Sequence, residues 1–160
     1  SRLGERVQLR PHCVIESSEI GDAVVIGPSA HLRPGNRLGS GVRIGNFVEL
    51  KNSTLGRGVK ADHLSYVGDA DVGDGATFGC GAITVNYDWR KKHRTQVGER
   101  AAIGCNANLV VPVSVGRDAA VAAGSTVTKD VPDGALAVER SETRHVEGWG
   151  RRLGRDAKKK

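Results

Sequence analysis

The sequence contains no methionine and few aromatic residues, with two Trp, two Tyr and two Phe among its 160 residues. This scarcity excludes a core built on large rings and favours one of short aliphatic side chains. No run approaches the ~18 apolar residues of a membrane helix, and no signal segment opens the chain, so we expect no membrane partner. The 38% share of hydrophobic residues is sufficient for one compact domain.

Cysteine is also scarce, and the three residues Cys13, Cys80 and Cys105 form no CxxC or His-associated spacing. An odd number of cysteines without metal-ligand spacing predicts free thiols in a reducing compartment, and the cytoplasm is the simplest one. The same spacing predicts no metal for this domain.

The chain carries a formal net charge of +6, and most of the excess lies at its C-terminal end. A basic cluster after the regular part of a sequence is typical of a solvated tail, and no stacking aromatics or nucleic-acid motif accompany it. We therefore expect no nucleic-acid partner. The cluster consists of Arg151, Arg152, Arg155, Lys158, Lys159 and Lys160.

An aliphatic residue returns at every sixth position between Val97 and Val127. A helix repeats its apolar face near every 3.6 residues and a half-buried strand every second residue, so neither explains this period. Six-residue repeats are typical of parallel β-helices, in which each sixth side chain enters a shared interior column. The pattern extends back through Leu3, Leu9, Ile15, Ile20, Ile26, Leu32, Leu38, Ile44, Leu50, Leu55, Ala61, Val67, Val72, Phe78 and Thr84.

Three steps of five residues interrupt this rhythm, before Ile20, Leu55 and Val72, and we interpret them as shortened corners. Small or β-branched residues two positions before each aliphatic residue suit a narrow interior. They are Val24, Ala30, Val42, Val48, Ala76, Ala101, Ala107, Val113, Ala119 and Ser125.

The repeat predicts a hexapeptide domain over residues 1–131 and a C-terminal segment with a basic tail over residues 132–160. Because the chain begins inside the repeat without Met, we expect earlier coils or a separate domain before Ser1. Residues 85–96 are too polar for a coil and predict an extruded loop. Its basic residues favour an anionic ligand, although they could equally serve only to solvate the loop.

Several strings carry a family resemblance: GPSAHLRPG, GNFVELKNSTLG, KADHLSYVGDADVGD, TVNYD and AAGSTVTKDVPDGALAVER. In order and spacing they resemble the C-terminal acetyltransferase domain of the bacterial bifunctional N-acetylglucosamine-1-phosphate uridyltransferase / glucosamine-1-phosphate N-acetyltransferase. The resemblance covers nearly the whole chain, and the family's N-terminal uridyltransferase domain has no counterpart in these residues.

The resemblance implies an all-β, left-handed parallel β-helix that assembles as a homotrimer with active sites between subunits. It also implies acetyl transfer from acetyl-CoA to the amine of glucosamine 1-phosphate, in the cytoplasm. The product would lead to UDP-N-acetylglucosamine for peptidoglycan and lipopolysaccharide precursors.

The reaction needs a base, because the amine must lose a proton as it attacks the thioester, and histidine titrates in the right range. His63, in DHLSY, matches the family's base, although a lone His in a coil is more often structural. The resemblance assigns the sugar and its phosphate to Arg33, Lys51, Tyr66, Thr77, Asn86 and Lys92. Arg and Lys suit a phosphate, whereas Thr77 replaces an Asn of the family and has a shorter reach.

For acetyl-CoA the resemblance implies the backbone N–H of Cys80, which would stabilise charge on the thioester oxygen. The other implied contacts are Asn86, Tyr87, Cys105, the backbone of Ala123, Arg140 and Trp149. Cys105 replaces a Ser of the family, and a thiol donates hydrogen bonds weakly. A covalent acetyl-cysteine would need His63 as its base, and the sequence does not place the two within reach. Cys80 and Cys105 are most simply small residues that fill the repeat.

Three other functions stay open. One is a hexapeptide acyltransferase with another amine or hydroxyl acceptor, which the phosphate-binding trio disfavours. Another is a catalytically silent scaffold, which would not need to keep Arg33, Lys51, His63 and Lys92 together. The third is a carbonic anhydrase of the same fold, which would need three imidazoles around a metal, and His63 has no partner histidine at coil spacing.

Overall fold

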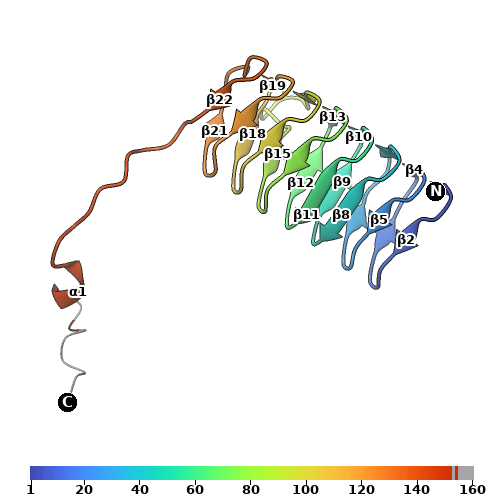
Figure 1. Ribbon diagram of the computed structural model, residues 1–160, viewed down its shortest axis with the longest axis horizontal. Coiled ribbons are helices and arrows are strands. Elements are labelled where there is room, and N and C mark those ends of the chain that lie inside the picture. Colours follow the sequence, from blue (N-terminus) through green and yellow to red (C-terminus); the bar gives the residue numbers. More distant parts are fainter. Residues whose placement is uncertain (153, 155–160) are drawn as a thin grey trace.

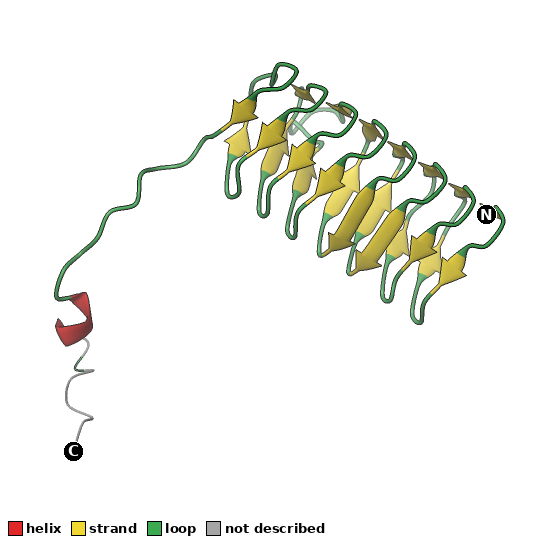
Figure 2. Ribbon diagram, viewed as in Figure 1, coloured by secondary structure: helices red, strands yellow, loops and turns green. Residues whose placement is uncertain are grey.

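The chain forms a left-handed parallel β-helix in which three flat sheets enclose a narrow core (Figure 1). The computed structural model describes residues 1–152 and residue 154. Successive strands enter different sheets, and up to β21 every third strand returns to the same sheet one coil further on. About eight coils stack in this way, which confirms the solenoid that the six-residue repeat predicts (Figure 2).

The strands are short, and neighbours within each sheet run parallel. The first sheet contains β1 (Arg2–Leu3), β4 (Glu19–Ile20), β7 (Arg37–Leu38), β10 (Thr54–Leu55), β13 (Ala70–Val72), β16 (Thr95–Val97) and β19 (Ser114–Val115). The second contains β2 (Gln8–Leu9), β5 (Val25–Ile26), β8 (Arg43–Asn46), β11 (Lys60–His63), β14 (Thr77–Phe78), β17 (Ala102–Ile103), β20 (Ala120–Val121) and β22 (Leu136–Ala137). The third contains β3 (Val14–Ile15), β6 (His31–Leu32), β9 (Glu49–Lys51), β12 (Tyr66–Gly68), β15 (Ile83–Val85), β18 (Asn108–Val110) and β21 (Thr126–Val127).

The core consists of stacked columns of the repeat residues. In the first sheet, Ile20 lies opposite Leu38 and Leu38 opposite Leu55, so equal positions of successive coils pack on one another. Every predicted repeat position from Ile20 to Val127 is buried, and so are the ten small residues two positions earlier. The alternation of inward and outward side chains along each strand produces this result.

Leu3 and Leu9 depart from the prediction, because they occupy repeat positions but are 47% and 48% exposed. Their strands belong to the first coil, which another coil covers on one side only. A solenoid coil buries its aliphatic face only against its neighbours, so these leucines stay half open.

Thr84 is a polar residue in an interior column and is 1% exposed. Its hydroxyl donates to the carbonyl of Gly68 at 2.9 Å and accepts from the Gly68 N–H at 2.8 Å. Both of its polar roles are therefore satisfied inside the core.

The extruded loop leaves the solenoid between β15 and β16. Val85, Thr95 and Gln96 belong to these strands, so the loop comprises residues 86–94 and is shorter than predicted. At the other end, β22 pairs with β20, so the solenoid extends to Ala137 and past the predicted limit at residue 131.

Beyond β22 the chain leaves the solenoid and reaches the short helix α1 (Trp149–Arg152), at the lower left of Figure 1. Arg155, Lys158, Lys159 and Lys160 of the predicted basic tail lie outside the described residues. In the described part of the chain, α1 has four residues, and no helix there has the length and hydrophobicity to span a bilayer.

Candidate active site

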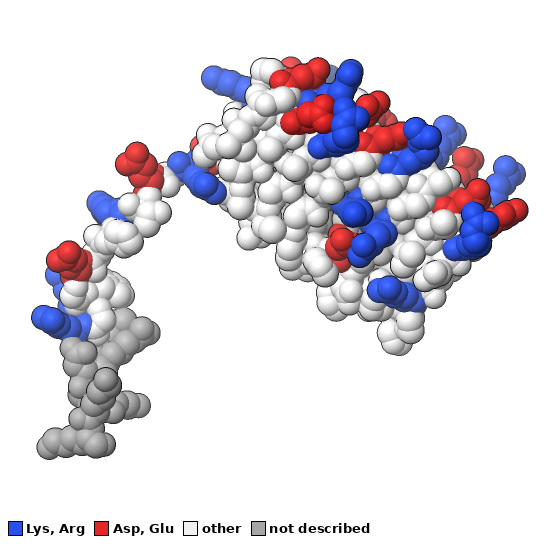
Figure 3. All heavy atoms as spheres, in the orientation of Figure 1, with Lys and Arg blue, Asp and Glu red and all other residues white. Residues whose placement is uncertain are grey.

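Two corners of the solenoid border the outer face of the third sheet, and most of the predicted site residues fall on one or the other. We call residues 63–65, 80–82, 105–107 and 123–125 the neutral corner, because they include no Lys, Arg, Asp or Glu. They connect the second sheet to the third. We call residues 33–36, 51–53, 69 and 86–94 the charged corner, which connects the third sheet to the first. Figure 3 shows charges of both signs along the upper part of the solenoid, and few on its lower edge over the later coils.

The neutral corner aligns four predicted site residues in one line. Strand pairing sets Ala61 opposite Phe78, Phe78 opposite Ile103 and Ile103 opposite Val121. Two residues further along each coil lie His63, Cys80, Cys105 and Ala123. The register continues through the corner, since Gly81 N–H donates to the Leu64 carbonyl and Asn106 N–H to the Cys80 carbonyl, each at 2.8 Å. Neighbouring strands lie about 4.8 Å apart, so each residue is one coil from the next.

The structure corrects the expectation that Cys80 and Cys105 fill the repeat, because both are exposed. Each lies two residues after an inward side chain, Phe78 or Ile103, where the chain turns out of its strand. His63 is exposed as well, and its imidazole forms no hydrogen bond with a described residue. A base at this corner is therefore open to a ligand.

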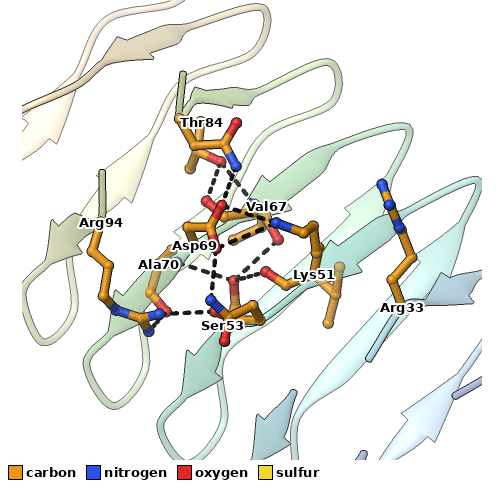
Figure 4. Close-up of polar contacts among 12 residues, drawn as sticks. Arg33, Lys51, Ser53, Val67, Asp69, Ala70, Thr84 and Arg94 are labelled. Carbon is orange, nitrogen blue, oxygen red and sulfur yellow. Dashed lines mark hydrogen bonds and ion pairs between the residues drawn. The ribbon is translucent and has the colours of Figure 1, made fainter. Parts of the chain in front are cut away.

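Asp69 organises the charged corner. Its side chain is 6% exposed and accepts hydrogen bonds from Asn52 Nδ2 at 2.7 Å and Asn86 Nδ2 at 2.5 Å. Lys51 Nζ lies 3.3 Å from its Oδ2 (Figure 4). Burial raises the pKa of Asp69, but the hydrogen bonds from Asn52, Lys51 and Asn86 outweigh it and hold this pKa below the ordinary value. One buried carboxylate thus fixes two predicted sugar-phosphate residues, Lys51 and Asn86.

Three cations gather beside this carboxylate. A hydrogen bond from the Lys51 ammonium to the Lys92 amine, which accepts it in the uncharged form, raises the pKa of Lys51; burial lowers this pKa and Asp69 raises it. Lys51 lowers the pKa of Lys92 through the same contact and through its charge, and the charge of Arg33 contributes in the same direction. Arg33 itself pairs with Glu49 at 3.2 Å and extends beside Lys51 in Figure 4. Mutual repulsion among these cations favours an anion between them.

Tyr66 lies between the two corners, on the outer face of β12. Its hydroxyl accepts a hydrogen bond from Asn86 Nδ2 at 3.3 Å. The ring lies along the strand over Gly68, because a methyl group on Gly68 would lie 2.3 Å from the Tyr66 hydroxyl oxygen. The absence of a side chain at Gly68 is therefore what allows Tyr66 to reach Asn86.

The extruded loop has its own internal bonds. Asp88 accepts from the backbone N–H groups of Lys91 at 2.7 Å and Arg90 at 2.9 Å, and its Oδ2 lies 2.6 Å from His93 Nε2. The backbone bond from Lys91, followed by the contact with His93, holds the pKa of Asp88 well below its ordinary range. These bonds order the turn that carries Lys92.

Arg94 fixes the end of the loop on the solenoid. Its guanidinium donates to both carboxylate oxygens of Asp71, with 2.9 Å from Nε to Oδ2. It also donates to the backbone carbonyls of Asn52 and Ala70, each at 3.0 Å. This single side chain joins the loop to two coils, and its contact with the earlier coil is visible in Figure 4.

The structure places the remaining predicted residues differently. Arg140 Nη1 donates to the Ala123 carbonyl at 2.7 Å, so these two predicted cofactor residues meet at the end of the neutral corner. Tyr87 packs its ring near that of Trp89, with centroids 6.2 Å apart. Thr77 is exposed on the second sheet and does not join Tyr66, while Trp149 lies in α1, away from the solenoid (Figure 1). Within one chain these two side chains do not reach the site.

Among the described residues, no three His, Cys, Asp or Glu side chains gather as metal ligands would. The charged corner instead offers cationic and amide groups, which suit an anion. At the neutral corner, the backbone N–H of Cys80 forms no hydrogen bond with any described residue, so it is available to a ligand oxygen.

Known proteins are similar to this chain in sequence. The family described as "Bacterial transferase hexapeptide (six repeats)" matches residues 17–52. The bifunctional protein GlmU of Caldicellulosiruptor saccharolyticus is 60% identical over 136 residues, which make up 85% of this chain and 29% of that protein. The chain is similar to GlmU over most of its own length. GlmU of Geobacillus sp. (strain WCH70) is 56% identical over 151 residues, or 94% of this chain and 33% of that protein. The chain therefore spans about a third of the curated relatives it matches.

Solved structures also resemble this chain. PerB from Caulobacter crescentus, in complex with CoA and GDP-perosamine, shares 30% identity with a TM-score of 0.64, over 72% of this chain and 53% of that one. LpxA of Bacteroides fragilis, a UDP-N-acetylglucosamine acyltransferase, shares 18% identity with a TM-score of 0.62, over 86% and 66% of the two chains. The second likeness concerns the fold alone.

Sequence reasoning missed two residues of the charged corner, Asp69 and Arg94. The sequence did contain a signal for Asp69, namely the five-residue step from Val67 to Val72. This short step leaves Asp69 as the single residue of a tight corner, where its φ is 49°. Arg94 gave no comparable signal, since its partners lie 23 and 42 residues away along the chain.

Proposed function

We propose that this chain transfers the acetyl group of acetyl-CoA to the amine of glucosamine 1-phosphate. The observation that carries the proposal is the arrangement of two unlike corners around one sheet face. A single accessible imidazole, His63, lies at the neutral corner. At the charged corner three cations gather beside Asp69, namely Arg33, Lys51 and Lys92, and Tyr66 lies between the two corners. Strand β12 spans on the order of 10 Å, a distance that a hexose phosphate bridges once side chains from both corners reach inward.

The cations would hold the phosphate of the acceptor. Arg33 offers a planar fork to phosphate oxygens, and Lys51 and Lys92 offer point charges. Asp69 keeps Lys51 in place, and the ordered loop presents Lys92. Tyr66 and Asn86, already joined at 3.3 Å, would bind the sugar hydroxyls. An acceptor without a phosphate would leave the three cations uncompensated, so we expect it to bind weakly.

His63 would take the proton from the amine as the new amide bond forms. The free N–H of Cys80, one coil away, would donate to the thioester oxygen as negative charge grows there. Because base and donor occupy the same corner line, they can act on one reacting centre. Cys105, Ala123 and Arg140 continue that line toward the C-terminal coils, where the pantetheine arm of acetyl-CoA would lie.

PerB, at 30% identity, was solved with CoA and an amino-sugar nucleotide, which supports a CoA-dependent transfer to an amino sugar. GlmU relatives support the specific acceptor and the route to UDP-N-acetylglucosamine for cell-wall precursors in the cytoplasm. We further propose that the active unit is a homotrimer with its sites between subunits. This would bring Thr77 and Trp149, which lie apart from the site in one chain, against a neighbour.

The test measures thiol release from acetyl-CoA with glucosamine 1-phosphate as acceptor and glucosamine as the control without phosphate. We expect turnover that depends on the phosphate. His63→Ala should lower kcat by roughly 10² to 10⁴ with a smaller change in KM, because general-base catalysis typically contributes that much. His12→Asn is a matched control: His12 is exposed in the first coil at a φ of 64°, which Asn tolerates.

Equal turnover of the unmutated chain and His63→Ala would show that His63 is not the base. Equal turnover of glucosamine would remove the role of the cation cluster and point to an acyltransferase with another acceptor. A correctly assembled protein with no turnover at all would favour a silent scaffold.

A further inference from the structure

Cys80 and Cys105 lie on adjacent coils in the same register, and both are exposed. Their backbones are joined directly, since Asn106 N–H donates to the Cys80 carbonyl at 2.8 Å and Gly79 N–H to the Ile103 carbonyl at 2.7 Å. The spacing of neighbouring strands, about 4.8 Å, falls within the ~4.4 to 6.8 Å between Cα atoms that a disulfide requires.

The sulfur of Cys105 points toward the coil of Cys80. A methyl group placed on Gly79 would lie 2.9 Å from Cys105 Sγ, so this sulfur covers the residue that directly precedes Cys80. Cys13 has no such neighbour. Its sulfur lies against Gly27 and the Ile26 carbonyl, in the early coils of the solenoid.

We infer that Cys80 and Cys105 form a dithiol that closes to an intramolecular disulfide when a small-molecule disulfide oxidises it, and that this bond suppresses acetyl transfer. The thiolate of one cysteine attacks the oxidant, forms a mixed disulfide and releases one thiol. The second thiolate displaces the other half of the oxidant as a second thiol and completes the Cys80–Cys105 bond. The cysteine pair loses two electrons and two protons, which the two released thiols carry.

The effect on activity rests on the proposed function. Cys80 supplies the proposed backbone donor, and Cys105 lies along the proposed path of acetyl-CoA. Drawing the two side chains together would turn the Cys80 peptide and occupy the space above Gly79. Loss of one oxyanion donor typically costs ~10² to 10³ in rate, so we expect the disulfide to lower acetyl transfer by at least about tenfold.

The experiment incubates the full chain with excess glutathione disulfide, alkylates the remaining thiols under denaturing conditions and measures intact mass and linked peptides. We expect a monomer that has lost two hydrogens, a peptide pair linked through Cys80 and Cys105, and an alkylated Cys13. Acetyl transfer should fall as the bond forms and recover with dithiothreitol. Cys80→Ser and Cys105→Ser should each block the bond and leave a glutathione adduct on the remaining cysteine. Cys13→Ser should change neither the bond nor the inhibition.

Separate glutathione adducts on both cysteines of the unmutated chain, free thiols throughout, or a bond between two chains would overturn the dithiol. A complete Cys80–Cys105 bond with unchanged acetyl transfer would show that the disulfide does not regulate activity. If the reduced protein never transfers acetyl, the proposed function fails, but the mass measurement still decides whether the dithiol closes.

Discussion

At the scale of single residues, Asp69 shows how a buried charge can serve a binding site. An isolated carboxylate inside a protein is costly unless hydrogen bonds and an opposite charge compensate it. Asp69 has both, with amide donors from Asn52 and Asn86 and the ammonium of Lys51. Two of these three partners, Lys51 and Asn86, are side chains that we also propose for the ligand.

We expect Asp69→Asn to lower the free energy of unfolding by about 1.5 to 3 kcal/mol at pH 7, the usual contribution of a hydrogen bond to a charged group. It should also raise KM for glucosamine 1-phosphate more than it lowers kcat, because Lys51 loses its anchor. Urea unfolding and steady-state kinetics measure the two effects. Asp118→Asn is the control: Asp118 pairs with Arg100 but its side chain is 54% exposed, so we expect at most about 1 kcal/mol.

The loss of unfolding free energy in Asp69→Asn should depend on pH in a defined direction. The pKa of Asp69 in the folded protein lies below its ordinary value, so the charged carboxylate stabilises the fold above the unfolded pKa of about 3.9. That stabilisation disappears as the pH falls through the folded pKa. The difference between wild type and Asp69→Asn should thus be constant above about pH 5 and shrink in stronger acid, and a difference that grew toward low pH would contradict this account.

At the scale of elements, strand β12 depends on a residue without a side chain. In Gly68→Ala, the new methyl group would occupy the place of the Tyr66 ring, so Tyr66 should lose its contact with Asn86. We expect a raised KM for the sugar phosphate and little change in KM for acetyl-CoA. Gly150→Ala, in α1, has open space around the new methyl group and should change neither value. Tyr66→Phe keeps the ring and removes the hydroxyl, so it measures the contribution of the hydroxyl alone to KM for the sugar phosphate.

The loop of residues 86–94 depends on Arg94 in a similar way. Arg94→Ala removes the bonds to Asp71 and to two backbone carbonyls, so the loop should open more often. We expect faster trypsin cleavage at Arg90, Lys91 and Lys92 and a higher KM for the sugar phosphate. Arg100→Ala breaks a comparable exposed pair with Asp118 in another coil and should leave loop cleavage unchanged. Equal cleavage in both variants would show that Arg94 does not anchor the loop.

At the scale of the whole molecule, the solenoid stabilises each coil through its neighbours. Leu50 is fully buried with coils on both sides, whereas Leu3 holds the same repeat position at the open end and is 47% exposed. Leu50→Ala should lower the free energy of unfolding by about 2 to 5 kcal/mol, the usual cost of such a cavity. Leu3→Ala should cost under about 1 kcal/mol. Denaturant unfolding measures both free energies of unfolding. Similar losses in the two variants would contradict the view that a coil depends on having neighbours on both sides.

The same contrast explains what the sequence could predict. The period of six, with its shortened corners, identifies the buried repeat positions from Ile20 onward, because one rule of side-chain direction applies to each coil. It does not distinguish Leu3 from Leu50, since burial depends on neighbouring coils. The inserted loop also obscured the alignment of Cys80 with Cys105, because their separation of 25 positions corresponds to one coil only when the loop residues are subtracted. Asp69 and Arg94 act across coils, and no local pattern marks such contacts.

The extruded loop departs from a corner where earlier coils turn through Gly35, Asn52 or Asp69. The two ends of any such corner are already held close together by the sheets, so a longer connection there adds only a small cost in chain entropy. Residues that bind a ligand can therefore be gained, lost or exchanged at one edge while the aliphatic columns stay as they are. Ligand specificity can therefore change at one corner without a loss of folding stability in the rest of the solenoid.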